Sequence, residues 1–208
     1  MSLDKIKLEN FLKKLTAYSS SDKIDNQYKK EVQIKNLKRY LENMDSIHPT
    51  LLLVGEAPGY QGCAITGVPF TSEFIINTHK NSFELNGCVA LGMKKEPTAT
   101  MVWGILDEKA NEGKLSVKPL MWNIFPFHPI REGNVKTNRR PSDNECMYGF
   151  YVLNELLDVF PSIEKIYAVG GAAAEKLKNH PKYKGLLRHP SNGGKQMFKE
   201  GIDKIYYK

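Results

Sequence analysis

The chain has 208 residues, of which 41% are hydrophobic and 25% charged, so it can form one globular domain with a substantial core. No apolar stretch is as long as a membrane span and no secretory signal pattern opens the chain, so we expect a cytoplasmic protein with no membrane partner. The net charge of +7 favours a polyanionic partner such as nucleic acid, and a solvated basic surface is the alternative.

Two amphipathic helices are predicted at the start of the chain. Apolar residues recur at helical spacing over 4–17 and again over 28–44, with the polar segment 19–27 between them. We expect these helices, within residues 1–48, to pack against a sheet that the rest of the chain forms.

From residue 50 the pattern changes to strands that alternate with helices. Strands are predicted over 50–54, 119–127, 163–170 and 184–191. Helices are predicted from Ser72, over 99–113, after Pro141 with the capping box SDNE, over 172–180, and over 193–208.

This succession predicts an α/β fold, a three-layer α/β/α sandwich with a central, mostly parallel four-stranded sheet. We expect it to fill residues 1–208 as a single domain. In such folds ligands bind outside the carboxyl ends of the strands. The loops 55–73, 123–141 and 188–196 are therefore expected to meet in one crevice.

The first of these loops follows the apolar strand in the segment LLLVGEAPGYQGCAITGVPF, residues 51–70. Its glycines suggest backbone N–H groups that are offered to an anion or a flat ligand. The loop lacks both GxxxxGK[ST] and GxGxxG, which disfavours an ordinary nucleotide-binding protein. Phe70 at its end is either a core residue or a platform on which a planar group stacks.

The second loop begins with Asn123, whose carboxamide carries one acceptor and two donors in a fixed plane and suits the edge of a base. An Asn that satisfies loop backbone is the alternative. Basic residues follow, and Arg139 and Arg140 among them either bind phosphates or are simply solvated.

The third loop, RHPSNGGK, holds His189 at the end of a strand, with its direction restricted by Pro190. A lone His is often structural, but this one lies where the crevice is expected. Glycine allows a phosphate to approach the backbone closely. The residues that follow therefore suggest a backbone clamp on phosphate: Ser191, Gly193, Gly194 and Lys195.

The three cysteines, Cys63, Cys88 and Cys146, are widely spaced and form no CxxC pair. Closed zinc sites and cysteine-held iron–sulfur clusters usually need closely spaced pairs. We therefore expect no metal and no cofactor, and a reducing compartment in which the thiols stay free.

Four motifs occur in order: GEAPG…GVPF, Asn123 with NRRP, AVGGAAAEKL, and HPS. Together they resemble the uracil-DNA glycosylase superfamily from about residue 50 to about residue 200. GEAPG is similar to the thermostable iron–sulfur branch, whose four cysteine ligands this chain lacks. The spacing of GYQGCAITGVPF more closely resembles the single-strand-selective monofunctional branch.

The resemblance implies a monofunctional DNA glycosylase that hydrolyses the N-glycosidic bond of uracil in base excision repair, acting as a monomer on DNA that contains uracil. Phe70 would stack on the flipped base, Asn123 would bind its N3–H and O4, and His189 would donate to O2. Further base contacts are implied for Gly55, Ala57, Gly59 and Tyr60. Contacts with the DNA backbone are expected from Arg139, Arg140, Ser191, Gly193, Gly194 and Lys195.

The residue that activates water stays open. Ala57 occupies the position at which the best-studied branches hold an Asp or Asn. Glu73 is slightly favoured over Glu56, and a dissociative reaction needs little help from any side chain. Ala57 also keeps open a weak or inactive member that binds DNA or a nucleobase, and a nucleotide-binding α/β protein is the other alternative.

The substrate range depends on the end of the first motif. Branches that are strict for uracil place a Tyr there, which blocks a 5-substituent, whereas this chain has Gly59 followed by Tyr60. We therefore expect 5-substituted uracils, 5-hydroxymethyluracil above all, to be accepted as well. Tyr60 could close the space instead.

Overall fold

The computed structural model describes residues 4–206 and has a four-stranded parallel sheet at its centre. The sheet order is β3-β2-β5-β6, and all three neighbouring pairs are parallel. The strands are β2 (Leu51–Gly55), β3 (Leu120–Asn123), β5 (Lys165–Val169) and β6 (Tyr183–Leu187). The predicted fold class is confirmed.

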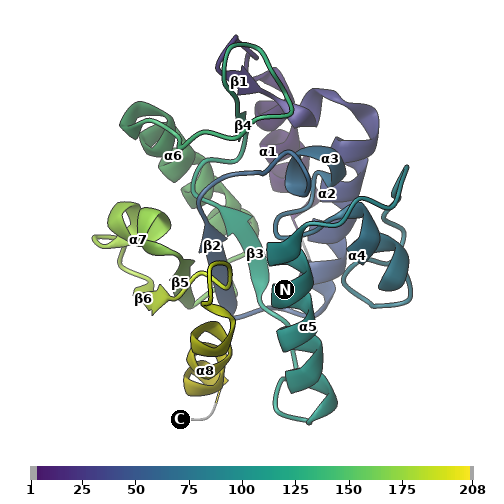
Figure 1. Cartoon of the computed structure of the whole chain (residues 1–208), viewed down its shortest axis with the longest axis vertical. Coiled ribbons are helices and arrows are strands. Elements are labelled where there is room, and N and C mark those ends of the chain that lie inside the picture. Colours follow the sequence, from purple (N-terminus) through teal and green to yellow (C-terminus); the bar gives the residue numbers. More distant parts are fainter. Residues whose placement is uncertain (1–3, 207–208) are drawn as a thin grey trace.

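Helices cover both faces of the sheet, as right-handed crossovers between parallel strands require (Figure 1). On one face lie α5 (Pro97–Asn111) and α8 (Lys195–Tyr206), joined by the ion pairs Lys199–Glu108 and Lys109–Asp203. On the other face lie α6 (Asp143–Val159) and α7 (Gly171–Leu177). Ser142 and Glu145 form the predicted capping box at the start of α6.

The two N-terminal helices pack beside β3. They are α1 (Lys5–Ala17) and α2 (Glu31–Ser46). The Phe11 ring of α1 lies 5.7 Å from the ring of Trp122, and the Tyr40 hydroxyl of α2 accepts a hydrogen bond from Met121 N at 2.9 Å. That bond satisfies a backbone donor on an edge strand of the sheet.

Several short elements were not predicted from the sequence. These are β1 (Ile24–Asp25), the 3-10 helix η1 (Gln27–Lys29), α3 (Cys63–Thr66) and β4 (His128–Pro129). The helix expected from Ser72 is α4 (Glu73–Thr78). Strands β1 and β4 form a separate antiparallel pair, which ties the segment before α2 to the loop after β3. A two-residue strand has no periodicity that a sequence could show.

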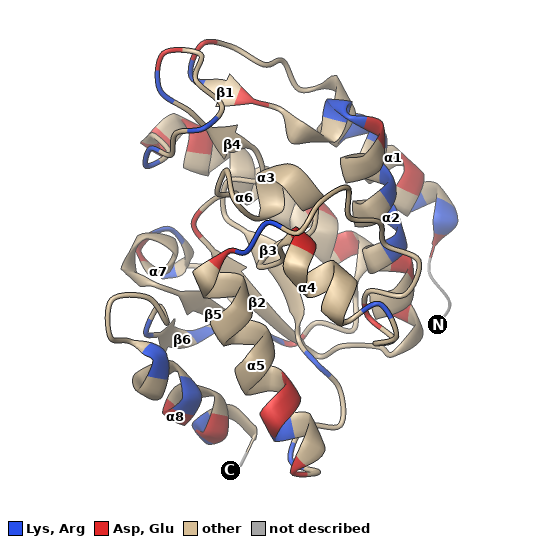
Figure 2. Ribbon diagram, turned by 45° about the vertical axis from the view of Figure 1, so that its right-hand side comes forward, with Lys and Arg blue, Asp and Glu red and all other residues tan. Residues whose placement is uncertain are grey.

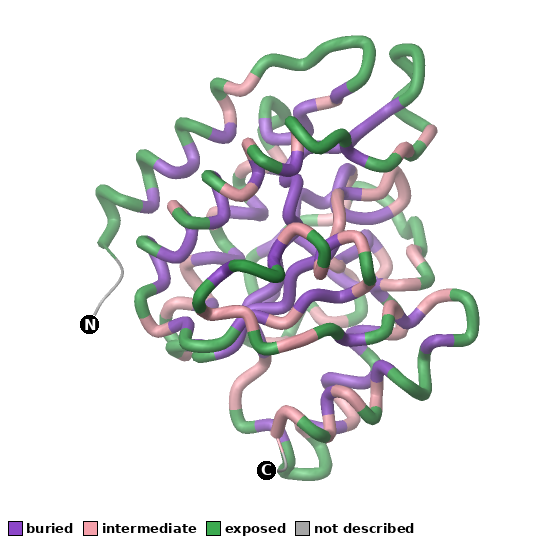
Figure 3. The backbone as a smooth tube through the Cα atoms, turned by 90° about the vertical axis from the view of Figure 1, so that its left-hand side faces the viewer, coloured by how far each residue is buried: buried purple, intermediate pink, exposed green. Residues whose placement is uncertain are grey.

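The core lies around the sheet (Figure 3). Every residue of β2 and β3 is buried, as expected for parallel strands covered on both faces. Charged side chains of both signs are spread over the outer helices, with several lysines and arginines on α1, α2 and α8 (Figure 2). In residues 4–206, no helix has the length and apolar character needed to cross a membrane.

Candidate active site

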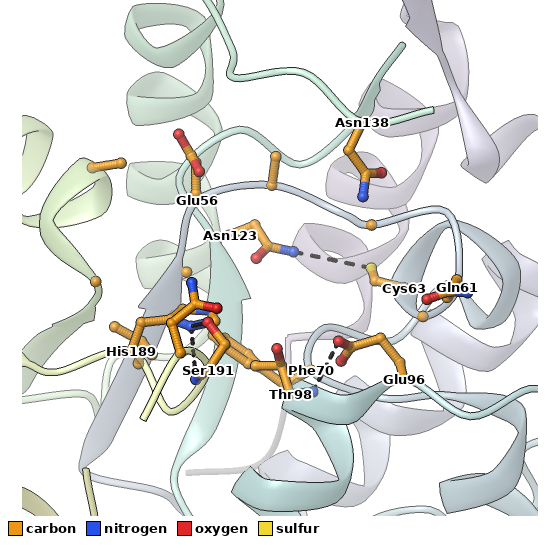
Figure 4. A pocket seen from close by; sticks show the side chains of 18 of the residues that line it. Glu56, Gln61, Cys63, Phe70, Glu96, Thr98, Asn123, Asn138, His189 and Ser191 are labelled. Atoms are coloured by element: carbon orange, nitrogen blue, oxygen red, sulfur yellow. Dashed lines mark hydrogen bonds between the residues drawn. The ribbon is translucent and has the colours of Figure 1, made fainter. Parts of the chain in front are cut away.

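A pocket of about 440 Å³ lies at the carboxyl ends of the parallel strands (Figure 4). Its volume is in the usual range for sites that bind small molecules. All three predicted loops contribute to it. The predicted residues that line it are Gly55, Glu56, Ala57, Gly59, Phe70, Asn123, His189 and Ser191.

Gly55, the last residue of β2, leaves room for two side chains of the pocket. A Cβ atom added to Gly55 would lie 2.6 Å from Phe70 Cζ and 2.8 Å from Asn123 Oδ1, closer than real Cβ contacts come. Asn123 ends the neighbouring strand β3 in register with Gly55. The aromatic ring and the carboxamide therefore converge on one point of the pocket floor.

Phe70 is held in an uncommon backbone conformation. Its φ is +51°, in the left-handed region that a bulky residue rarely adopts. The indole nitrogen of Trp103 donates to Phe70 O at 3.0 Å, and Trp103 is fully buried in α5. Such strain persists only where the surroundings impose it, and it is concentrated at functional sites.

Asn123 is 5% exposed. Among residues 4–206, the hydrogen bond of its carboxamide is a long one, from Nδ2 to Cys63 Sγ at 4.0 Å. Burial raises the pKa of the Cys63 thiol to about 12, so it stays protonated and weakly polar. A buried amide with so little protein bonding has donors and an acceptor left for a ligand.

His189 is fixed by the residue two positions after it. Its Nδ1 accepts the backbone N–H of Ser191 at 3.3 Å and lies 2.7 Å from Ser191 Oγ. A nitrogen that accepts a backbone N–H carries no proton, so the neutral imidazole has its proton on Nε2. His189 thus offers a donor to the pocket that it lines.

The surroundings of His189 favour this neutral form. Burial lowers its pKa below the ordinary value of 6.5, Glu96 opposes that shift, and Arg188 adds to it. Gly194 allows the backbone to fold tightly here, because an added Cβ would lie 2.0 Å from His189 O. The loop for which a phosphate clamp is expected therefore also sets the orientation of the His189 ring.

Glu56 lies at the pocket rim. Burial raises the pKa of its carboxyl, and Arg140 opposes the shift. Arg140 Nε is 3.4 Å from Glu56 Oε1, while its Nη2 is 3.0 Å from Glu175 Oε2. The Arg140 side chain is 63% exposed and remains available to an anion at the rim.

The expected position of Glu73 is wrong. Glu73 is 8% exposed and does not line the pocket. Its Oε2 accepts the backbone N–H of Lys94 at 3.0 Å and faces Gly92. The first turn of α4 directs this carboxylate toward residues 92–94, so it fixes that segment and is not placed to hold water for the pocket.

Arg139 is also misassigned as a phosphate-binding residue. Its Nε donates to Ile130 O, Nη1 to Arg140 O and Glu145 Oε2, and Nη2 to Lys23 O and Glu145 Oε1. A guanidinium has five N–H donors, and these five bonds occupy all of them. Arg139 therefore links the loop after β3, helix α6 and the segment around Lys23, and its guanidinium has no N–H donor left for DNA.

Other predicted residues lie beside the pocket. Tyr60 does not line it, although Gly59 does. Gly193 and Lys195 line a second hollow near α5 and α8, which borders the first pocket through Ser191 and Asn192.

Several residues of the lining were missed in the sequence: Gln61, Glu96, Thr98, Asn138, Arg188 and Asn192. Asn138 belongs to the motif NRRP, in which the two arginines are the more prominent signal. Glu96 precedes Pro97 and caps α5 by accepting from Thr98 N and Ala99 N, a pattern that the sequence could have shown.

Over residues 4–206, the His, Cys, Asp and Glu side chains form no group of three or more that could hold a metal ion. The three cysteines are buried and free. The polar groups that line the pocket are amides, carboxylates, hydroxyls, one imidazole, the Cys63 thiol and the Arg188 guanidinium, and they do not form a ligand cluster.

A family model described as the uracil DNA glycosylase superfamily matches residues 42–205. Among solved structures, the chain is similar to the crystal structure of wild-type SMUG2 from Pedobacter heparinus, with a TM-score of 0.69, 16% sequence identity and 96% of each chain covered. No curated protein matches the chain. At that identity the likeness to the Pedobacter structure shows a shared fold, and the family model carries the relationship in sequence.

Proposed function

The chain belongs to the uracil DNA glycosylase superfamily, and from this premise we propose that it hydrolyses the N-glycosidic bond of uracil in DNA. The observation that carries the proposal is the convergence of Phe70, Asn123 and His189 on one pocket from three separate loops. A planar ring, a base-edge amide and a neutral imidazole are the groups that such a reaction needs.

Base recognition would use Phe70 and Asn123. The Phe70 ring stacks on a base that has left the duplex, and the Asn123 carboxamide accepts from N3–H and donates to O4. Cytosine presents the opposite pattern at these two positions. A carboxamide held in one orientation therefore rejects cytosine by leaving buried groups unpaired.

Bond cleavage would use His189. As the C1′–N1 bond breaks, its electron pair moves onto the base and negative charge collects on O2, while positive charge develops on the sugar. The Nε2–H of neutral His189 donates to O2 and stabilises the departing anion. A preorganised donor of this kind is worth about 3–4 kcal/mol in the transition state.

The attacking water would lie at the rim formed by Glu56 and Asn138. Figure 4 shows both side chains on that side of the pocket, with Asn123 between them and His189. Asn138 donates to the water oxygen, and the Glu56 carboxylate accepts the proton that the water loses when it bonds to C1′. Since the reaction is dissociative, we expect Glu56→Gln to slow it only modestly.

We also propose that the enzyme is monofunctional. Bifunctional cleavage requires an amine that forms a Schiff base with the sugar. No lysine is present in the pocket lining within the described range 4–206. The product would then be an abasic site that alkali, but not the protein, converts into a strand break.

A labelled oligonucleotide with a single uracil, in single-stranded and duplex form, tests the proposal. The oligonucleotide is incubated with excess enzyme in the presence of chelator and is then treated with alkali. We expect one cleaved band at the uracil position. A protein that binds the oligonucleotide but leaves the base in place would instead be the inactive binding member that Ala57 suggested. Activity that returns only with a divalent ion would contradict the cofactor-free mechanism.

The proposed substrate range includes 5-hydroxymethyluracil. A Cβ added to Gly59 would be in ordinary van der Waals contact with Asn138 Nδ2 at 3.8 Å, so glycine leaves room there for a group the size of a methyl, and Tyr60 does not line the pocket. A polar 5-substituent can replace a pocket water, whereas a methyl group displaces it without restoring its hydrogen bonds. Competition between uracil, 5-hydroxymethyluracil and thymine in matched oligonucleotides should rank thymine last. Uracil-only cleavage that a Tyr60→Ala variant relaxes would show that Tyr60 closes the space.

A further inference from the structure

Asn138 has a carboxamide whose orientation can be read from its partners. Its Oδ1 lies 3.1 Å from the backbone nitrogen of Tyr60. A backbone N–H can only donate, so the Asn138 atom that it meets must be the oxygen. Nδ2 therefore lies on the other side of the amide, and Figure 4 shows it directed into the pocket.

A second donor reaches the same oxygen from below the rim. His128 Nε2 is 3.2 Å from Asn138 Oδ1 and 2.9 Å from Thr137 O. Both partners are acceptors, so Nε2 carries the ring proton. His128 Nδ1 is buried without a partner in residues 4–206, which leaves the imidazole neutral.

The ring of His128 is itself firmly seated. His128 is 1% exposed and belongs to β4, where it pairs with Asp25 of β1. Its backbone N–H donates to Gln27 Oε1 at 3.2 Å, and Gln27 Nε2 donates to Pro126 O at 2.8 Å. Because both the backbone and the ring of His128 are fixed, His128 can hold the neighbouring Asn138 carboxamide in one orientation.

We propose that His128 is a positioning residue of the active site: its Nε2–H fixes the Asn138 carboxamide so that Nδ2 donates into the pocket. The inference rests on the proposed function, in which Asn138 holds the attacking water. His128 touches neither base nor water. It acts only through Asn138, in the way that outer hydrogen bonds orient the ligands of a metal.

The proposal predicts which kinetic step responds. Without the His128 donor, Asn138 Oδ1 keeps only the Tyr60 N–H, and the amide can rotate away from the water. His128→Leu should lower the single-turnover rate of uracil excision by roughly tenfold, the scale of one hydrogen bond. Affinity for uracil-containing DNA should stay the same, because the stacking and edge-reading groups are intact. Equal losses in rate and affinity would overturn the proposal.

A double-mutant cycle tests whether His128 acts through Asn138. His128→Leu in an Asn138→Ala background should cause no further loss of rate. Independent, multiplying losses would mean a separate structural role and would overturn the proposal. His128→Gln, which can place an N–H donor near the position of Nε2, should recover part of the rate that His128→Leu loses.

His180 provides a matched control. It is 7% exposed, its Nε2 lies 3.4 Å from Asn154 Oδ1, and neither residue lines the pocket. His180→Leu removes a similarly buried imidazole from an asparagine partner. It should lower the melting temperature without changing the excision rate, so a comparable loss of rate would mean that destabilisation alone explains the His128 result.

A measurement without substrate separates this inference from the proposed function. In nitrogen-15-labelled protein, the side-chain amide signal of Asn138 is identified by its absence in Asn138→Ala. We expect a nuclear Overhauser contact from this signal to the Gly59 α-protons, lost in His128→Leu. A contact that persists in His128→Leu overturns the inference. Absence of uracil excision by the wild-type protein overturns the proposed function alone.

Discussion

The ring of Phe70 and the carboxamide of Asn123 approach each other over the one residue of β2 that has no side chain. Both would collide with a Cβ atom at Gly55, at 2.6 Å and 2.8 Å. The proposed stacking group and the proposed base-reading group are thus positioned by the absence of a Cβ at the end of a buried strand. Pocket shape at this point depends on backbone position, which the sheet fixes.

Gly55→Ala should therefore abolish most of the activity while the fold survives. We expect at least a tenfold loss in single-turnover rate and a destabilisation of about 1–3 kcal/mol, typical of overpacking. Gly104→Ala in α5 is the control, because no atom lies within 4 Å of its added Cβ. That change should stabilise the helix by roughly 1 kcal/mol and leave the rate as it was. Normal excision by Gly55→Ala would show that Phe70 and Asn123 are not positioned by contact with this glycine.

Asn123→Asp should reduce uracil excision by at least about a hundredfold, the scale of one lost transition-state donor. A carboxylate cannot donate to O4, and its charge opposes the anion that forms on the base. His189→Ala should cost a similar factor by removing the donor to O2. Single-turnover rates at saturating enzyme measure both, with Asn154→Asp as a variant outside the pocket. Near-full activity in either pocket variant would make that residue structural.

The rate should fall on the acid side and stay flat near neutrality. Burial depresses the pKa of His189 below 6.5, so the neutral, Nε2-protonated form persists at neutral pH. Protonation of Nδ1 would break the bond from Ser191 N–H and release the ring. Single-turnover rates measured between about pH 5 and 8 should therefore decrease with acidification only below pH 6.5, the ordinary pKa of a histidine. The Glu56→Gln variant should show the same decrease, because His189 and not Glu56 causes it. A rate that rises on acidification would mean that the imidazolium is the active form.

Neighbouring arginines should respond in opposite ways to substitution. Arg140→Gln should lower the slope of log affinity against log salt by about one, because it removes the phosphate contact that we propose for this exposed side chain. Arg139→Gln should leave the slope unchanged and instead reduce the free energy of unfolding by about 1–3 kcal/mol, since it breaks a largely buried network around Glu145. Fluorescence anisotropy and denaturant titration measure the two effects. A reduced salt slope in Arg139→Gln would show that Arg139 does contact DNA phosphate.

The sequence predicted the main elements well because their signals are local. The apolar runs of β2 and β3, and the capping box of Ser142 and Glu145, are short patterns with a direct physical cause. Glu73 and Arg139 were misjudged because their roles depend on direction. A sequence does not show that one carboxylate turns toward Lys94 N, or that one guanidinium has all five donors occupied.

The candidate site was predictable only as far as its loops carry motifs. Asn123 ends β3, His189 follows β6 and Phe70 closes the loop after β2, and the three residues line one pocket. His128 gave no such signal, because its partner strand has two residues and lies about a hundred positions earlier in the chain.

The β1–β4 pairing has a consequence for how much of the chain makes up a working unit. The family model matches from residue 42, yet Lys23 O accepts from Ile130 N and from Arg139, and Gln27 supports His128. A shortened protein that begins at residue 42, where the family match begins, would keep every motif of the superfamily. It would lose the contacts of Lys23 and Gln27 that support the loop after β3 at one rim of the pocket. We therefore expect the unit that folds and works by itself to extend at least to Lys23, well before the residue at which the family match begins.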